Sequence, residues 1–202
     1  MDYFPNTSTI PKGGTILFSS SVALLFGYVL WSLPSVLLAL LVVCGGRWLV
    51  RRRRGRSVQW PCELAVLLFV CYLAFLLSIT LNLEMVWVSL FHGWIPPAPR
   101  WFQGGINLHL WSGLRVDSLW EGIMLVGNVA LFLPLGVFVP FLWRWKRVIP
   151  VVAVGAALSL SIEGMQFVVG RAVDVSDVFL NTLGTALGWL LYTRVSMVQF
   201  RT

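Results

Sequence analysis

Long apolar runs, separated by short polar segments, set the pattern of this chain of 202 residues. A helix needs roughly twenty apolar residues to cross the hydrocarbon core of a bilayer. The first run contains Pro34, and a break there would leave two pieces too short to cross, so we expect one tilted helix that kinks at Pro34. The pattern predicts an all-α, polytopic membrane helix bundle with about five transmembrane helices. These predicted spans lie at about 16–44, 63–83, 119–142, 148–168 and 177–194.

The composition leaves no room for a separate soluble domain. Hydrophobic residues make up 58% of the chain, and charged residues only 11%. A formal net charge of +7 could indicate nucleic-acid binding, but six arginines gather between Arg47 and Arg56, beside an apolar run. Such a cluster is typical of a cytoplasmic flank next to anionic lipid. We therefore expect membrane lipids as partners and no nucleic acid.

The distribution of basic residues predicts the orientation of the bundle, because cytoplasmic loops carry an excess of Lys and Arg. We place the N-terminus outside and the C-terminus in the cytoplasm. Eleven of the fifteen basic residues then fall on the inside, and the four outside are Lys12, Arg100, Arg115 and Arg171. The sequence thus predicts a multi-pass protein of the cell membrane, and we make no prediction of its oligomeric state.

Polar side chains gather where three predicted spans meet the outer side. Glu163 and Gln166 share one face of the fourth span, because they are three residues apart. The short segment GRAVDVS then joins this span to the fifth as a hairpin. An ionisable residue at such a depth is costly in lipid and is a functional candidate by default. The candidate outer-leaflet polar site comprises Asn128, Glu163, Gln166, Arg171, Asp174, Asp177 and Asn181.

Each of these residues also has a structural interpretation. Asp174 and Asp177 begin the fifth span, where a carboxylate can cap a helix N-terminus. Arg171 can form an ion pair with a neighbouring acid, or can present its planar fork of donors to a phosphate or carboxylate. The amide side chains can join helices through hydrogen bonds. Glu163 is the strongest functional candidate of the set.

Small residues predict close helix packing beneath this site. Gly184 and Gly188 form a GxxxG pattern, which lets a neighbouring backbone approach the fifth span. We expect that neighbour to be the third or the fourth span. Pro134 and Gly136 predict a distortion in the third span.

The longest connection, about 84–118, is rich in aromatic residues and lies on the predicted outer side. Aromatic rings favour the head-group layer, so this loop either anchors the protein at the interface or forms a lid over a site beneath it. His92 and His109 lie in the loop without a third ligand nearby, so we expect no metal site and no cofactor.

Three blocks of the sequence resemble the VanZ-like family of membrane proteins. The first, GGINLHLW, has the Asn-Leu pair of the family at Asn107 and Leu108, but Leu110 and Trp111 replace its usual Pro-Phe. The second, NVALFLPLGVFV, begins with the family's Asn and contains its Pro-x-Gly.

The third block, 158–192, is the most specific. It follows the family's order of Glu-x-x-Gln, then Arg/Gly-x-x-Asp-x-x-Asp, then Asn-Thr-x-Gly-x-x-x-Gly. The residues that fit are Glu163, Gln166, Arg171, Asp174, Asp177, Asn181, Thr182, Gly184 and Gly188.

The resemblance implies a division of the chain into two parts. Residues 61–202 would form a VanZ-like four-helix membrane domain, and residues 1–60 an N-terminal transmembrane helix followed by an arginine-rich cytoplasmic loop. VanZ itself is linked to low-level resistance to teicoplanin, an antibiotic glycopeptide that carries an acyl chain. The resemblance therefore implies a role in the cell envelope.

Three kinds of function remain open from the sequence. The first is a non-enzymatic protein that binds a lipoglycopeptide or the head group of a lipid-linked envelope precursor in the outer polar site. The second is an intramembrane enzyme acting on a polyprenyl-phosphate or phospholipid head group, with Glu163 or Asp177 as acid–base residue and Arg171 holding phosphate. The third is a transporter or an accessory subunit, although the chain has no evident internal repeat.

The predicted orientation can be tested with single-cysteine variants in a background without the native cysteines. A cysteine placed in the connection 169–173 should react with a membrane-impermeant maleimide in intact cells, and one placed in 195–202 only after lysis. Labelling in the opposite order would contradict the orientation.

Overall fold

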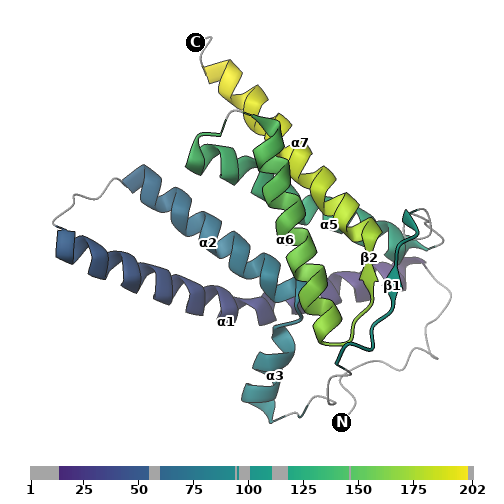
Figure 1. The fold of residues 1–202 in the computed structure, drawn as a ribbon. Coiled ribbons are helices and arrows are strands. Elements are labelled where there is room, and N and C mark those ends of the chain that lie inside the picture. Colours follow the sequence, from purple (N-terminus) through teal and green to yellow (C-terminus); the bar gives the residue numbers. More distant parts are fainter. Residues whose placement is uncertain are drawn as a thin grey trace.

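A computed structural model describes residues 14–54, 60–93, 95, 101–110, 118–145 and 147–199 (Figure 1). Long helices dominate these residues, which confirms the predicted all-α bundle. Two strands of two residues each form a small parallel pair that the apolar pattern does not predict. The elements are α1 Gly14–Arg54, α2 Trp60–Thr80, α3 Glu84–His92, β1 Ile106–Asn107, α5 Leu119–Trp143, α6 Val148–Val168, β2 Val173–Asp174 and α7 Val175–Gln199.

Among the described residues, four helices are long and apolar enough to cross a membrane. Three of them reproduce the second, third and fourth predicted spans, and the segment in α1 begins and ends later than the predicted 16–44. The helix α7 covers the predicted fifth span but is not among the four, and it carries Asn181, Thr182 and Thr185 in its interior. The protein is a multi-pass membrane protein, and a count of five spans stays a prediction. The four segments are Val29–Arg53, Cys62–Thr80, Glu121–Trp143 and Val148–Val168.

The helix α1 is one continuous helix that passes through Pro34. It also continues through Arg47 and Arg51–Arg54, so these arginines belong to its last turns and the predicted arginine loop is wrong for them. Arg56 lies outside the described residues. Arginine favours helices, and two of these side chains form ion pairs with Glu63 on α2. Both effects stabilise the helical conformation of this segment.

The direction of the helices brings four helix ends together. At one end of the bundle, Gln166 of α6 donates to the carbonyl oxygen of Thr80 at the end of α2, over 2.7 Å. The helix α7 then returns antiparallel to α6 and runs parallel to α5, which Gly184 and Gly188 contact at Val129 and Leu133. The ends of α2 and α6 therefore meet the beginnings of α5 and α7 (Figure 1).

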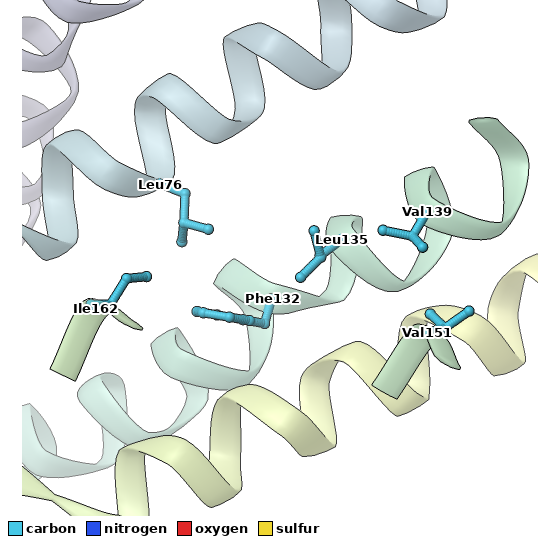
Figure 2. Close-up of a cluster of buried hydrophobic side chains, with 6 residues drawn as sticks. All are labelled: Leu76, Phe132, Leu135, Val139, Val151 and Ile162. Carbon is cyan, nitrogen blue, oxygen red and sulfur yellow. The ribbon is translucent and has the colours of Figure 1, made fainter. Parts of the chain in front are cut away.

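A small apolar core joins α2, α5 and α6. Figure 2 shows its side chains pointing into the space between these helices. Because lipid tails are as apolar as leucine, such a core stabilises a membrane bundle through van der Waals packing rather than through removal of apolar surface from water. The fully buried members are Leu76, Phe132, Leu135, Val139, Val151 and Ile162.

The helices α5 and α7 touch backbone to backbone. A Cβ atom added at Gly184 would lie 2.2 Å from the carbonyl oxygen of Val129, and one at Gly188 would lie 2.0 Å from that of Leu133. From the other side, a Cβ atom at Gly136 would lie 2.0 Å from the carbonyl oxygen of Thr185. Three glycines thus allow an approach that no side chain permits, and α5 continues as a helix through Pro134 and Pro140 beside it.

The predicted outer loop 84–118 contains the helix α3, which the apolar pattern does not reveal. Its Trp87 indole donates to the Ser35 hydroxyl of α1 over 2.7 Å, and Ser78 of α2 donates to the same oxygen over 3.3 Å. The helix ends at Gly93, which adopts a left-handed conformation with φ 66°. These contacts fix α3 against the first two long helices.

Gly184→Ala should destabilise the bundle, because the new methyl group collides with the backbone of α5. Overpacking of this kind costs about 1–3 kcal/mol. We expect a lower melting temperature of the purified protein in detergent. Gly127→Ala is the matched control, since its Cβ would meet nothing within 4 Å. Equal melting temperatures for the two variants would contradict a direct contact between α5 and α7.

Candidate functional site

The connection between α6 and α7 is a tight turn. After α6 ends, Gly170 adopts φ 87°, a conformation that residues with a Cβ rarely adopt. The Arg171 amide then donates to the carbonyl oxygen of Gln166 over 2.9 Å. The chain leaves this turn through β2 and enters α7 at Val175. The turn therefore fixes Arg171 and Asp174 at the end of the bundle.

The segment 101–110 lies directly on this turn. The strands β1 and β2 pair in parallel, with Ile106 opposite Val173 and Asn107 opposite Asp174. The Asn107 amide also donates to the Asp174 carboxylate over 2.9 Å. Gly104 is in contact with the turn, because a Cβ atom there would lie 1.7 Å from the carbonyl oxygen of Arg171. Segment 101–110 thus covers one side of the turn between α6 and α7.

The two aspartates hold the beginning of α7 in place. Asp174 Oδ1 accepts a hydrogen bond from the Ser176 amide over 2.8 Å, which satisfies one of the free N–H groups at the helix start. The Ser176 hydroxyl in turn donates to the carbonyl oxygen of Leu110 over 3.1 Å. Asp177 Oδ1 accepts from the Asn128 amide of α5 over 2.6 Å. In the folded chain, Asp174 therefore caps the beginning of α7, and Asp177 links α7 to α5.

Glu163 is the most buried acid of the cluster, with 4% of its surface exposed. Its Oε2 accepts a hydrogen bond from the Asp174 amide over 3.2 Å, which ties the last turns of α6 to β2. It also interacts electrostatically with Asp177, Arg171 and Asp174. Three acids and one arginine therefore share one small volume.

Arg171 forms no ion pair in the described part of the chain, where the only ion pairs are those of Glu63 with Arg47 and Arg51. Its Nη1 donates to the carbonyl oxygen of Thr80 over 3.1 Å, and its side chain is exposed. Gln166 donates to the same oxygen and is buried. One N–H group of the guanidinium is thus bound to Thr80, and its other N–H groups can donate to a ligand.

Asn181 lies one turn deeper than Asp177 on α7. Its amide nitrogen donates to the Ser159 hydroxyl of α6 over 2.9 Å, and both residues are buried. Its side-chain oxygen has no hydrogen-bond partner in the part of the chain that the structure describes. Asn181 therefore joins α6 to α7 rather than opening toward the surface.

The structure brings the predicted site residues to the same end of the bundle. Asn128, Asp174, Asp177 and Glu163 are linked through direct hydrogen bonds or charge, and Arg171 lies beside them at the surface. Gln166 connects this group to α2, while Asn181 lies further inside. The glycines Gly184 and Gly188 lie below the cluster, against α5.

Sequence reasoning did not assign several residues that build this site. Gly104 and Asn107 belong to the first block of the family resemblance, so a signal for them exists. Ser159 and Ser176 lie within the third block but are not among the residues that fit the family's order. Their partners Asn181 and Leu110 lie 22 and 66 residues away in the chain. Thr80 contributes a backbone oxygen, which no side-chain pattern reveals.

The described residues around the two histidines were predicted to lack a third metal ligand. No group of three His, Cys, Asp or Glu side chains within the described residues has the geometry to hold a metal ion. The ring of His92 packs edge-on against Trp31, with ring centres 5.4 Å apart.

The VanZ/LLP1 family model matches residues 64–197, which is well over half of the chain. The match covers α2 from Leu64 onward, the helices α3, α5 and α6, and α7 up to residue 197, together with the whole polar cluster. It leaves out α1. No curated protein and no solved structure matches the chain.

Gly104→Ala should detach segment 101–110 from the turn between α6 and α7, because the methyl group would collide with the Arg171 carbonyl. The Val173 amide donates to the carbonyl oxygen of Gly105 over 2.9 Å. We expect hydrogen exchange of this amide to become at least about tenfold faster, as expected when local opening becomes easier. Gly105→Ala is the control, since nothing lies within 4 Å of its Cβ position. Unchanged exchange in Gly104→Ala would contradict the contact.

Proposed function

This multi-pass membrane protein belongs to the VanZ/LLP1 family, and from this membership and its polar cluster we propose that it binds the head group of a lipid-linked or lipidated ligand. The proposed location is the outer leaflet of the cell membrane, following the orientation predicted from its basic residues. The ligand class is a lipid-linked envelope precursor or a lipoglycopeptide. The protein holds this ligand and performs no reaction on it.

The observation that carries the proposal is the exposed arginine beside a buried acidic cluster. Each guanidinium group has five N–H donors, and the hydrogen bond to Thr80 uses one of those of Arg171. A planar guanidinium matches a phosphate or carboxylate with two parallel hydrogen bonds. Arg171 is therefore suited to hold the anionic group of a ligand at the membrane surface.

The half-buried aspartates offer the complementary chemistry. Asp174 and Asp177 each accept hydrogen bonds from the protein, but a carboxylate has about four acceptor positions. Hydroxyl or ammonium groups of a head group can donate to the remaining ones. A ligand with both an anionic group and many donors, such as a lipid-linked sugar or a lipoglycopeptide, fits this combination.

Exposed apolar side chains next to the turn favour a ligand that also carries a tail. Phe102, Ile106 and Leu108 are each more than half exposed. The ring of Phe102 packs against Phe167 at the end of α6, with ring centres 6.0 Å apart. A tail can therefore follow this segment into the bilayer while its head group stays at Arg171.

The alternative is an intramembrane enzyme with Glu163 or Asp177 as acid–base residue. The proximity of these two acids to Arg171 favours this view. The burial of Glu163 and its hydrogen bond to the Asp174 amide speak against it, because a catalytic carboxylate must reach a substrate. We therefore rank binding above catalysis.

Arg171→Gln should weaken ligand binding about tenfold, the effect of losing charge-assisted hydrogen bonds. Binding of fluorescent undecaprenyl phosphate and of labelled teicoplanin to the protein in nanodiscs measures this effect. Glu121→Gln is the control, because Glu121 is an acid at the same end of the bundle and glutamine also suits its capping box. If teicoplanin is the ligand, expression changes the sensitivity of cells to it, and Arg171→Gln abolishes the change.

Two results would overturn the proposal. One is the absence of binding by the wild-type protein to either probe. The other is formation of product from a labelled lipid carrier that is lost in Glu163→Gln, which would establish the enzyme instead.

A further inference from the structure

Three charged side chains join the last turns of α1 to the first turn of α2. Glu63 accepts two hydrogen bonds from Arg47, over 2.7 Å at Oε2 and 2.5 Å at Oε1. Arg51 forms a second ion pair with the same carboxylate. This ion-pair cluster lies at the end of α1 and α2 that points away from α3 (Figure 1). One carboxylate thus holds two guanidinium groups in fixed positions.

The ion-pair cluster keeps an excess of positive charge and of donors. Two guanidinium groups carry ten N–H donors, more than one carboxylate can accept. The side chains of Arg47 and Arg51 are 38% and 29% exposed, so their remaining donors can reach a ligand. Arg52 and Arg53 follow directly on α1 and are exposed. Neither α1 nor α2 carries a second acid to neutralise them.

The ion-pair cluster lies where the apolar part of the protein ends. The apolar stretch of α2 begins at Leu64, directly after Glu63. Trp48 on α1 is 59% exposed, and the Arg52 guanidinium lies 5.3 Å from the centre of its ring. Exposed tryptophan and arginine together are typical of the head-group layer. The ion-pair cluster thus has the composition of a surface at the depth of lipid phosphates.

We propose that this arginine-rich end is a binding site for an anionic phospholipid. The phosphate accepts hydrogen bonds from Arg47 and Arg51, and Arg52 and Arg53 add positive charge around it. Glu63 is a positioning residue, since it aligns the two guanidinium groups without contacting the lipid. The site lies outside the family match and does not depend on the proposed head-group site at the other end of the bundle.

The decisive variant is Glu63→Gln, because two views of this surface predict opposite results. It raises the net charge by one, so simple charge attraction predicts equal or stronger binding of anionic lipid. A built site predicts weaker binding, because the guanidinium groups lose their alignment. Native mass spectrometry of the protein from nanodiscs of mixed phosphatidylglycerol and phosphatidylcholine counts the retained lipids. We expect phosphatidylglycerol to be retained in preference, and about tenfold less in Glu63→Gln.

The controls separate the lipid site from loss of the fold. Glu121→Gln makes the same charge change at the opposite end and should leave lipid retention unchanged. The double variant Arg52→Gln/Arg53→Gln leaves the ion-pair cluster intact and should both weaken retention and reduce its salt dependence. Equal retention of the two lipids by the wild type, or unchanged or increased retention of phosphatidylglycerol in Glu63→Gln, would overturn the proposal.

Discussion

The direct backbone contact between α5 and α7 is the constraint on which the rest of the structure depends. In a bilayer, helices gain little from hiding apolar surface, so they associate where their backbones can approach closely. Gly136, Gly184 and Gly188 remove the side chains that would keep α5 and α7 apart. This contact sets the register of the two helices and brings Asn128 within hydrogen-bond distance of Asp177. The polar end of the bundle therefore follows from glycines several residues away from it.

The polar groups at this end stabilise the fold through hydrogen bonds, and Arg171 among them is exposed at the surface. Glu163, Asp174 and Asp177 accept hydrogen bonds from β2, Asn107, Ser176 and α5, which offsets the cost of burying them. These bonds hold α7, the turn and segment 101–110 as one unit. Within the described residues, the Arg171 side chain makes one hydrogen bond, to the carbonyl oxygen of Thr80, and is exposed. The hydrogen-bonded acids and the exposed guanidinium group beside them are the features on which the proposed head-group binding rests.

Among the described residues, the two ends of the bundle differ in charge. Acids dominate the end at which α6 meets α7, whereas arginines dominate the end of α1. Glu63 is the exception, and its carboxylate is used to hold Arg47 and Arg51. The three residues of the ion-pair cluster precede residue 64, where the family match begins. The proposed lipid site therefore belongs to the part of the chain that the family model does not cover.

Local patterns in the sequence determined the long helices, since burial in a bilayer demands long apolar runs that can be read residue by residue. They also identified the polar residues from Glu163 to Asn181 as a candidate site and the glycines beneath them as positions of close helix packing. The tertiary structure alone decided that Asn107 and Thr80 reach this cluster, that Gly104 must lack a side chain, and that arginines 51–54 continue a helix. These features rest on contacts between segments far apart in the chain, and several use backbone atoms. The type of a residue does not identify a partner that lies far away in the chain or that contributes only a backbone atom, so only the folded chain reveals these contacts.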